Sequence, residues 1–266
     1  MARIRVFSYL PNPRVSKATI AARLCGVEVE VRGAPAGELV DWLWDFDAEP
    51  ISLVDPATVE AARQLGRIGF KDRTLYKTAA FLRANPFGTV PAAFSGDGEI
   101  GIFESNSIMR AVARLGVEVY PLYGTGPYEA SRIDSFLDVS LVFARDAQLY
   151  LFELRGEAVS PQVYARASEA FTTYIGGLER ALEPDRPAIS GDQISLADIC
   201  FACELSLFHN EGARLDALKA NKQQPILQGA RERFPFVFAH FDRLIDHPAF
   251  SPDLGPYMAK LRRSFI

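Results

Sequence analysis

The chain has 266 residues, of which 48% are hydrophobic and 23% are charged, and its formal net charge is −4. This composition is ordinary for a globular protein, and without a run of Lys or Arg it gives no footprint for binding nucleic acid. No apolar segment reaches the ~18 residues that span a bilayer, so no membrane insertion is expected. The length suits one large domain or two small ones.

The cysteine content indicates a reducing, cytoplasmic setting, because three cysteines are too few for a disulfide framework. The start of the chain enters a strand pattern directly, so we expect no secretory signal. Cys200 and Cys203 form a CxxC pair inside an apolar helical run. Since reactive thiols need an accessible, electropositive site, we interpret both as core residues. The three histidines are not at ligand spacing, so no metal site is predicted.

The first third of the chain predicts a strand, a helix and a second strand. Residues 3–9 alternate between charged and apolar side chains, as a strand does, and residues 14–25 have helical spacing that stops at Gly26. The segment VEVEVRG alternates again. The pattern then breaks over residues 35–75, where we expect helical pieces around the two tryptophans.

A hairpin follows this insertion. The segment KTAAFLRANPFG predicts a short helix and a turn. VPAAF and EIGIF predict two strands, because the Gly-rich turn SGDGE joins them. SNSIMRAVARLG then predicts a helix.

From Tyr128 onward the sequence shows only helical runs. They cover residues 127–155, 162–183, 196–210, 213–220, 225–246 and 256–263. Residues 120–130 are rich in Gly and Pro and mark a natural boundary. We therefore expect an α/β domain over residues 1–118 and an all-helical domain over residues 127–266.

The β-α-β, insertion, α-β-β-α order, with Val-Pro opening the third strand, resembles a thioredoxin-like domain with a mixed four-stranded sheet. Followed by an all-helical domain, it resembles the glutathione transferase superfamily. The segments NPFGTVPAAF and FESNSI carry this resemblance in the first domain. In the second domain it rests on ISLADICFA, whose Ser195 and Asp198 form a helix capping box that we assign to folding.

Two subfamilies compete within this resemblance. KTAAFLRANPFGTVP is like the phi-type transferases of plants and bacteria. NPRVSKATIAARLCGVEVEVRGAP, together with GIFESNSI, is more like the amino-terminal domain of the gamma subunit of eukaryotic elongation factor 1.

The resemblance implies glutathione as cosubstrate and assigns five residues to binding it. A cis Val90-Pro91 bond turns the N–H and C=O of Val90 toward the cysteinyl part, as an added strand would. Glu104 takes the ammonium, and Ser105, with the helix start, takes the glutamyl carboxylate. Lys77 takes the glycyl carboxylate. For Glu104 and Ser105 the alternative is a helix cap alone, and for Lys77 a solvated helix start.

Transfer chemistry also needs a group that favours the glutathione thiolate. In serine-type relatives a hydroxyl stands five residues before a basic residue. Counting back from Lys17 reaches Asn12, an amide. Asn12 or Arg14 is therefore the predicted catalytic donor; alternatively, Asn12-Pro13 is only a turn and a helix start. No cysteine occurs in this loop, which argues against mixed-disulfide chemistry.

The second substrate is expected in an apolar pocket that suits an aromatic electrophile. The residues predicted to line it are Tyr9, Phe136, Ser140 and Phe143. Thiolytic cleavage of an aryl ether is one variant of the reaction. We expect a homodimer, with a heterodimer with a related chain as the alternative. The alternative to an enzyme is a non-catalytic binding or assembly module of the same fold.

Overall fold

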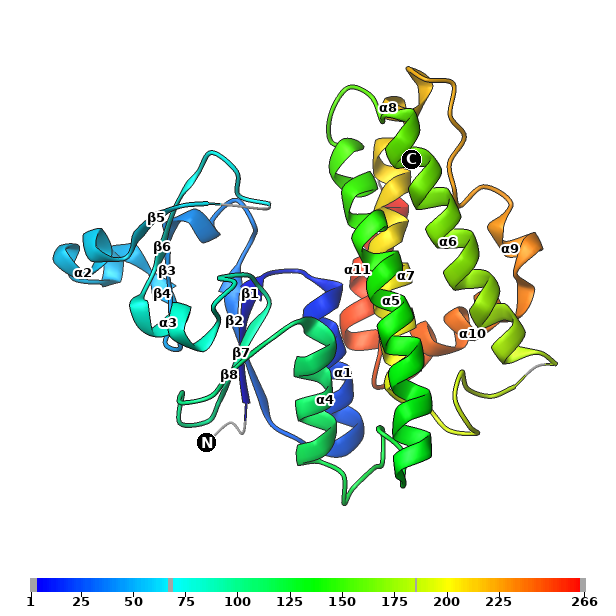
Figure 1. Cartoon of the computed structure of the whole chain (residues 1–266), viewed down its shortest axis with the longest axis horizontal. Helices are drawn as coiled ribbons and strands as arrows, with labels where there is room; N and C mark the ends of the chain where they lie inside the picture. The colour runs from blue at the N-terminus through cyan, green and yellow to red at the C-terminus, as the bar shows by residue number, and fades with distance from the viewer. Residues whose placement is uncertain (1–3, 67–68, 185, 264–266) are drawn as a thin grey trace. The chain divides into compact units, whose positions relative to one another are not determined.

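The computed structural model describes residues 4–66, 69–184 and 186–263, which form two compact units, Met1–Gly116 and Val117–Ile266. The helices and strands of each unit are labelled in Figure 1. The expected domain boundaries, residues 118 and 127, lie beside this division. No helix in the described ranges is both long and apolar enough to cross a membrane.

The first unit contains the predicted thioredoxin-like sheet. Its strands are β1 (Ile4–Tyr9), β2 (Val29–Ala34), β7 (Ala92–Ser95) and β8 (Gly101–Phe103), in the order β2-β1-β7-β8. β1 and β2 are parallel, whereas β7 is antiparallel to both β1 and β8. The predicted mixed four-stranded sheet is therefore confirmed.

Two helices, α1 (Pro13–Cys25) and α4 (Ser105–Leu115), lie side by side against this sheet (Figure 1). α1 ends where Gly26 takes the left-handed conformation, with φ +67°. Glycine adopts this conformation at little cost because it has no Cβ. The helix thus ends where the sequence predicts.

The insertion differs from the prediction of helical pieces, because it forms a second four-stranded sheet. Its strands are β3 (Trp42–Trp44), β4 (Glu49–Pro50), β5 (Arg63–Leu65) and β6 (Thr74–Lys77), in the order β4-β3-β6-β5. Strands of two to four residues are too short to show an alternating pattern. Among the described residues of the insertion, the helical segments are η1 (Leu39–Asp41), η2 (Ile51–Leu53) and α2 (Pro56–Ala61).

The inserted sheet packs on the thioredoxin-like sheet through aromatic side chains. Trp44 is fully buried, with its ring 5.6 Å from that of Phe7 and 6.0 Å from that of Phe81, which lies in α3 (Ala79–Ala84). Its indole N–H donates to the carbonyl of Leu39 at 3.0 Å. Both rings meet Trp44 edge-on, an arrangement that aromatic pairs prefer. Trp44 therefore belongs to the core of the first unit.

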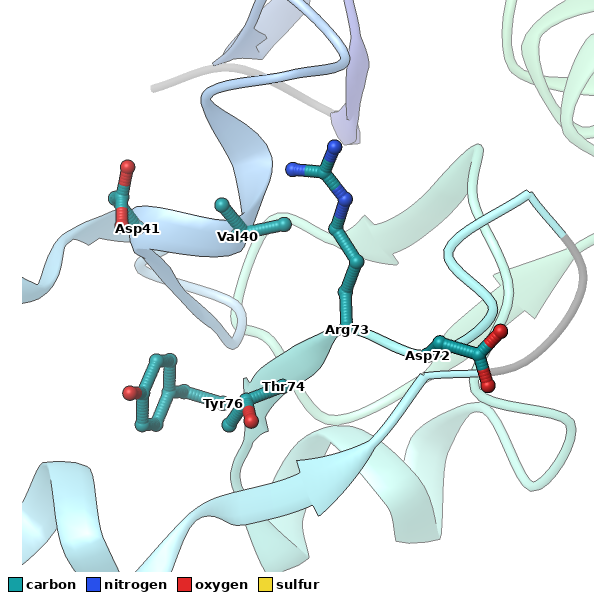
Figure 2. A pocket seen from close by; sticks show the side chains of 6 residues that line it. All are labelled: Val40, Asp41, Asp72, Arg73, Thr74 and Tyr76. Carbon is teal, nitrogen blue, oxygen red and sulfur yellow. The ribbon is translucent and has the colours of Figure 1, made fainter.

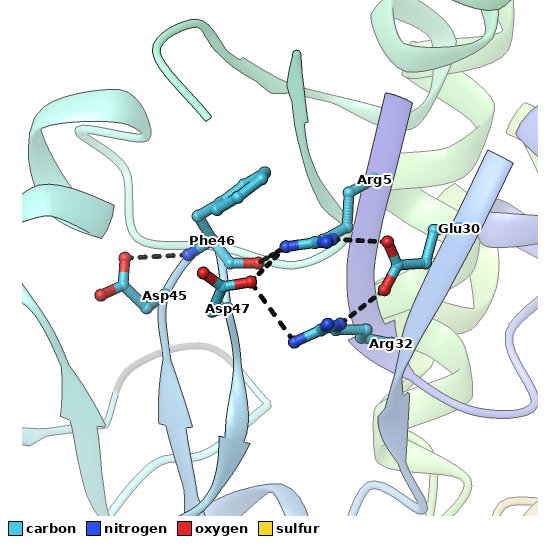
Figure 3. A network of polar contacts seen from close by, with 6 residues as sticks. All are labelled: Arg5, Glu30, Arg32, Asp45, Phe46 and Asp47. Carbon is cyan, nitrogen blue, oxygen red and sulfur yellow. Dashed lines mark hydrogen bonds and ion pairs between the residues drawn. The ribbon is translucent and has the colours of Figure 1, made fainter. Parts of the chain in front are cut away.

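A network of charges ties the turn after β3 to the edge of the first sheet (Figure 3). Arg5 bonds to Glu30 at 2.8 Å and also to Asp47, and its guanidinium lies 4.1 Å from the centre of the Phe46 ring. Arg32 reaches the other Glu30 oxygen at 2.7 Å. The hydrogen bonds from Arg32 and Arg5 hold the pKa of the Glu30 carboxyl below its usual value.

The second unit is helical, as predicted, around a core of aromatic rings. The Phe143 ring stacks on Tyr174 at 4.9 Å and lies 5.6 Å from Phe208. The predicted run over 225–246 is two helices, because Pro235 starts a new one. The elements of this unit are α5 (Pro127–Glu153), α6 (Pro161–Leu182), α7 (Leu196–Phe208), η3 (His209–Arg214), α8 (Asp216–Lys219), α9 (Ala230–Arg233), α10 (Pro235–Asp246) and α11 (Ser251–Arg263).

The cysteines give a first testable prediction. Cys25, Cys200 and Cys203 are free thiols with no exposed surface, and burial raises the pKa of the Cys25 thiol to about 11. Because the thiolate is the reactive form, a thiol reagent such as dithionitrobenzoate should release no rapid colour from the native protein at pH 8. In denaturant it should count three thiols. A rapid native reaction would show that the CxxC pair is accessible and reopen a redox role.

Candidate functional site

Three loops meet at one end of the thioredoxin-like sheet. Ala92, the first residue of β7, is paired with Phe7 of β1 on one side and with Phe103 of β8 on the other. The residues after β1, before β7 and after β8 are therefore neighbours at this end. Both α1 and α4 begin here, so their positive ends point to the same region. An anionic ligand would be favoured at this end of the sheet.

Val90 offers an unused stretch of backbone beside this point. It is half-buried and directly precedes Pro91, and the peptide bond between them is cis. Its N–H and C=O take part in no backbone hydrogen bond with the other described residues. An extended peptide pairs with free backbone of this kind as an added strand does.

Glu104 has a strained backbone and an exposed side chain. Its φ is +67° and its ψ is 122°, a combination that non-glycine residues rarely adopt and that costs roughly 1–3 kcal/mol. The carboxylate is exposed, does not cap α4, and bonds to no other described residue. Folding alone does not explain a strained residue whose side chain does nothing for the helix. Such strain is typical of ligand-binding sites.

Ser105 is the first residue of α4 and is buried, at 8% exposure. Lys17 of α1 donates to the Ser105 hydroxyl at 3.3 Å and to Asn106 Oδ1 at 2.8 Å. In the sequence Lys17 served only to locate Asn12, and its contacts with Ser105 and Asn106 were not predicted. A signal was present, because Lys17 lies three and four residues before the buried Ile20 and Ala21, on the apolar face of the helix.

Lys77 lies under the turn that leads to Val90. Its ammonium is buried, donates to the carbonyl of Gly88 at 2.7 Å, and sits 4.7 Å from the centre of the Trp44 ring. Gly88 has φ +60°, and a Cβ there would lie 3.1 Å from Lys77 Nζ. The expected alternative, a solvated lysine at a helix start, is wrong, because Lys77 is buried at the end of strand β6.

The side chain of Asn12 is held within the protein at the start of α1. It is 3% exposed, its Oδ1 accepts from the backbone N–H of Arg14 at 3.0 Å, and its Nδ2 donates to Ser8 Oγ at 3.1 Å. These are the bonds of a helix cap. Arg14, the other predicted donor, and Tyr9, predicted for the second-substrate pocket, are half-buried.

Replacing Asn12 by Ala tests how much the cap contributes. The free energy of unfolding should fall by ~1–2 kcal/mol, since the variant loses a cap and leaves the buried Ser8 hydroxyl without its donor. Denaturant titration measures this difference. Asn12→Asp, which keeps the cap acceptor, should lose less stability than Asn12→Ala. Equal losses in the free energy of unfolding for both variants would show that the Oδ1 cap acceptor does not stabilise the protein.

The residues predicted for the second-substrate pocket differ in how deeply they are buried. Ser140 and Phe143 lie in the core of the helical unit. The Ser140 hydroxyl donates to the Leu137 carbonyl at 2.6 Å and accepts from Cys200 Sγ at 3.2 Å. Phe136 is half-buried, with the guanidinium of Arg132 4.7 Å above its ring.

A shallow pocket of about 400 Å³ lies on the inserted sheet (Figure 2). It contains none of the residues predicted to bind glutathione. Nor do the described parts of the chain gather three or more His, Cys, Asp or Glu side chains as a metal-binding group. The lining residues are Val40, Asp41, Asp72, Arg73, Thr74 and Tyr76.

Comparison with solved structures identifies the fold. A glutathione transferase F7 from Populus trichocarpa superposes with a TM-score of 0.63 at 17% identity, covering 96% of this chain and 99% of that one. A transferase from Methylobacterium radiotolerans, solved with glutathione sulfonate, gives 0.61 at 20% identity and 95% coverage of both chains. The protein has the fold of the glutathione transferase superfamily.

Sequence comparison points to a particular group of relatives. The chain is 30% identical over 256 residues to probable elongation factor 1-gamma 1 of Arabidopsis thaliana, and 27% identical over 259 residues to human elongation factor 1-gamma. These alignments cover 93% and 96% of this chain but 48% and 47% of those proteins, so the chain spans about half their length. No family model matches the sequence.

Proposed function

We propose that the protein binds glutathione at the end of the sheet where β7 and α4 begin, and transfers it to an apolar electrophile. The observation that supports binding best is Glu104, whose strained backbone holds an exposed, uncommitted carboxylate at the start of a helix. Glutathione carries an ammonium group beside a carboxylate at its glutamyl end. The Glu104 carboxylate suits the ammonium, and the Ser105 hydroxyl beside it suits the glutamyl carboxylate.

The remaining groups of glutathione find partners at the same end of the sheet. The backbone of Val90 pairs with the cysteinyl part, and the first N–H groups of α4 join Ser105 on the glutamyl carboxylate. Lys77 contributes positive charge near the glycyl carboxylate while it keeps its bond to Gly88.

For the chemical step, the start of α1 and the Arg14 side chain favour the thiolate over the thiol. We favour Arg14 over Asn12 because a guanidinium is charged, whereas the Asn12 amide is neutral, buried, and bonded to Ser8 and to the Arg14 N–H. The thiolate sulfur forms a bond to carbon of the electrophile, and a halide or phenolate leaves with the bonding electron pair. An aryl ether is a substrate of this type. Tyr9, the last residue of β1, is the residue we retain for its apolar part.

A second candidate function is a non-catalytic module that binds or assembles with other proteins. The similarity to elongation factor 1-gamma supports it, as does the commitment of Asn12 to a helix cap. In that case the partner would belong to an elongation factor complex. In either case we propose a dimer, with itself or with a related chain.

A conjugation assay separates the two functions. We expect the protein to accelerate attack of glutathione on an aryl halide or aryl ether. Arg14→Ala should lower kcat/KM by ~10–100-fold and move the rising limb of the pH profile upward, because more thiol stays protonated. Arg23→Ala, at the other end of α1, is the matched control and should change the rate less than ~2-fold. Glutathione binding without any conjugation would favour the non-catalytic module.

A further inference from the structure

Lys17 is a buried cation placed under the start of α4. Only 1% of it is exposed, and it lies on α1, 88 residues before the Ser105 whose hydroxyl it contacts. Its ammonium donates to Ser105 Oγ at 3.3 Å and to Asn106 Oδ1 at 2.8 Å, so it bridges two successive residues in the first turn of α4. Burying an ammonium is costly, and a fold that needed only a packed helix pair would be served by an apolar side chain.

The contact sets the direction of the Ser105 hydroxyl. A hydroxyl has one hydrogen and two lone pairs, whereas an ammonium can only donate. Ser105 Oγ therefore accepts from Lys17, and its own hydrogen points away from the ammonium. The hydroxyl is thereby prepared as a donor toward an acceptor on the side opposite Lys17.

The charge of Lys17 also reaches such an acceptor. A carboxylate held by the Ser105 hydroxyl at ~2.7 Å would lie within about 6 Å of Lys17 Nζ. Opposite charges at this distance attract one another strongly where water is excluded. The positive end of α4 acts in the same direction, and α4 is long enough, at 11 residues, to contribute a dipole.

We propose that Lys17 is a positioning residue for the glutamyl carboxylate of glutathione and that it acts through Ser105. The inference rests on the proposed function, since it concerns the same site. Lys17 does not touch the ligand. It orients the hydroxyl that does, and it adds a fixed positive charge behind it.

The test combines a change in the protein with a change in the ligand. Calorimetry compares glutathione with an analogue whose glutamyl α-carboxylate is an amide. Lys17→Met should weaken glutathione binding by ~10–30-fold, because the charge and the hydroxyl orientation are both lost. The same variant should change binding of the amide analogue by less than ~3-fold, since that ligand carries no charge at this position.

Further variants separate positioning from folding. Adding Lys17→Met to Ser105→Ala should weaken glutathione little beyond the stronger single effect, because the two residues act as one unit. Lys17→Gln keeps a donor without the charge; it should weaken binding by ~3–10-fold and serves where Lys17→Met does not fold. Lys219→Met, an exposed lysine of α8, is the control for loss of a charge.

Each possible result supports or overturns the positioning role of Lys17. Equal weakening of both ligands, or no weakening of either, overturns the positioning role while glutathione binding by the wild type stands. Wild-type protein that binds no glutathione overturns the proposed function and this inference with it.

Discussion

Replacing Asp198 by Ala is expected to lower the free energy of unfolding by about 4 kcal/mol. Asp198 is fully buried at the start of α7. Its Oδ2 accepts from the backbone N–H of Ser195 at 2.8 Å, and its Oδ1 accepts from the N–H of Ile189 at 2.9 Å and from His240 Nε2 at 2.8 Å. Alanine leaves all these donors buried without an acceptor.

The two ring nitrogens of His240 have different partners. Arg243 Nη2 lies 3.3 Å from His240 Nδ1, and a guanidinium only donates. Nδ1 is therefore an acceptor, and the ring proton sits on Nε2, which donates to Asp198. The buried Asp198 carboxylate thus links the N-terminal cap of α7 to the His240 side chain of α10.

Chemical denaturation, read through the helical signal, measures the expected loss. Asp55→Ala is the matched control, because Asp55 caps α2 through the N–H groups of Ala57 and Thr58 but is exposed. It should cost only ~1 kcal/mol. If Asp198→Ala costs no more than Asp55→Ala, the buried network does not stabilise the helical unit.

The sequence predicted this network only in part. The Ser195-to-Asp198 spacing of a capping box is local and can be seen in four residues. The contact with His240, 42 residues further on, depends on how α7 and α10 pack, which no local pattern contains. The same contrast applies to the fold: the six-residue strands β1 and β2 show an alternating pattern and were predicted, whereas the inserted strands of two to four residues are too short to show one.

Replacing Glu104 by Gln is expected to weaken glutathione binding by ~30–100-fold. A carboxylate that accepts from the ligand's ammonium makes a charge-assisted hydrogen bond, worth ~2–3 kcal/mol where water is largely displaced. The amide keeps the size and the strained backbone but loses the charge. Because the Glu104 side chain bonds to no other described residue, the free energy of unfolding should change by less than ~0.5 kcal/mol.

Titration calorimetry and thermal unfolding of the same samples test both halves of this prediction. Glu99→Gln, in the exposed turn between β7 and β8, is the control for loss of one negative charge and should bind as the wild type does. Similar weakening in both variants would indicate a general effect of charge. A large loss of stability in Glu104→Gln would assign Glu104 to folding.

The candidate site was also predicted unevenly, for physical reasons. Val90, Pro91, Glu104 and Ser105 stand next to strand and helix boundaries, which local patterns reveal. Whether a polar side chain points toward a ligand or into the protein depends on packing. Ser140 and Phe143 turn into the helical core for that reason, and Lys17 turns toward Ser105.

The most direct test of glutathione binding is calorimetric titration of reduced glutathione into the wild-type protein. We expect saturable binding at one site per chain, with a dissociation constant in the micromolar to low millimolar range. Absence of saturable heat up to ~10 mM glutathione would contradict it, since affinity weaker than that leaves too little free energy for a dedicated peptide site.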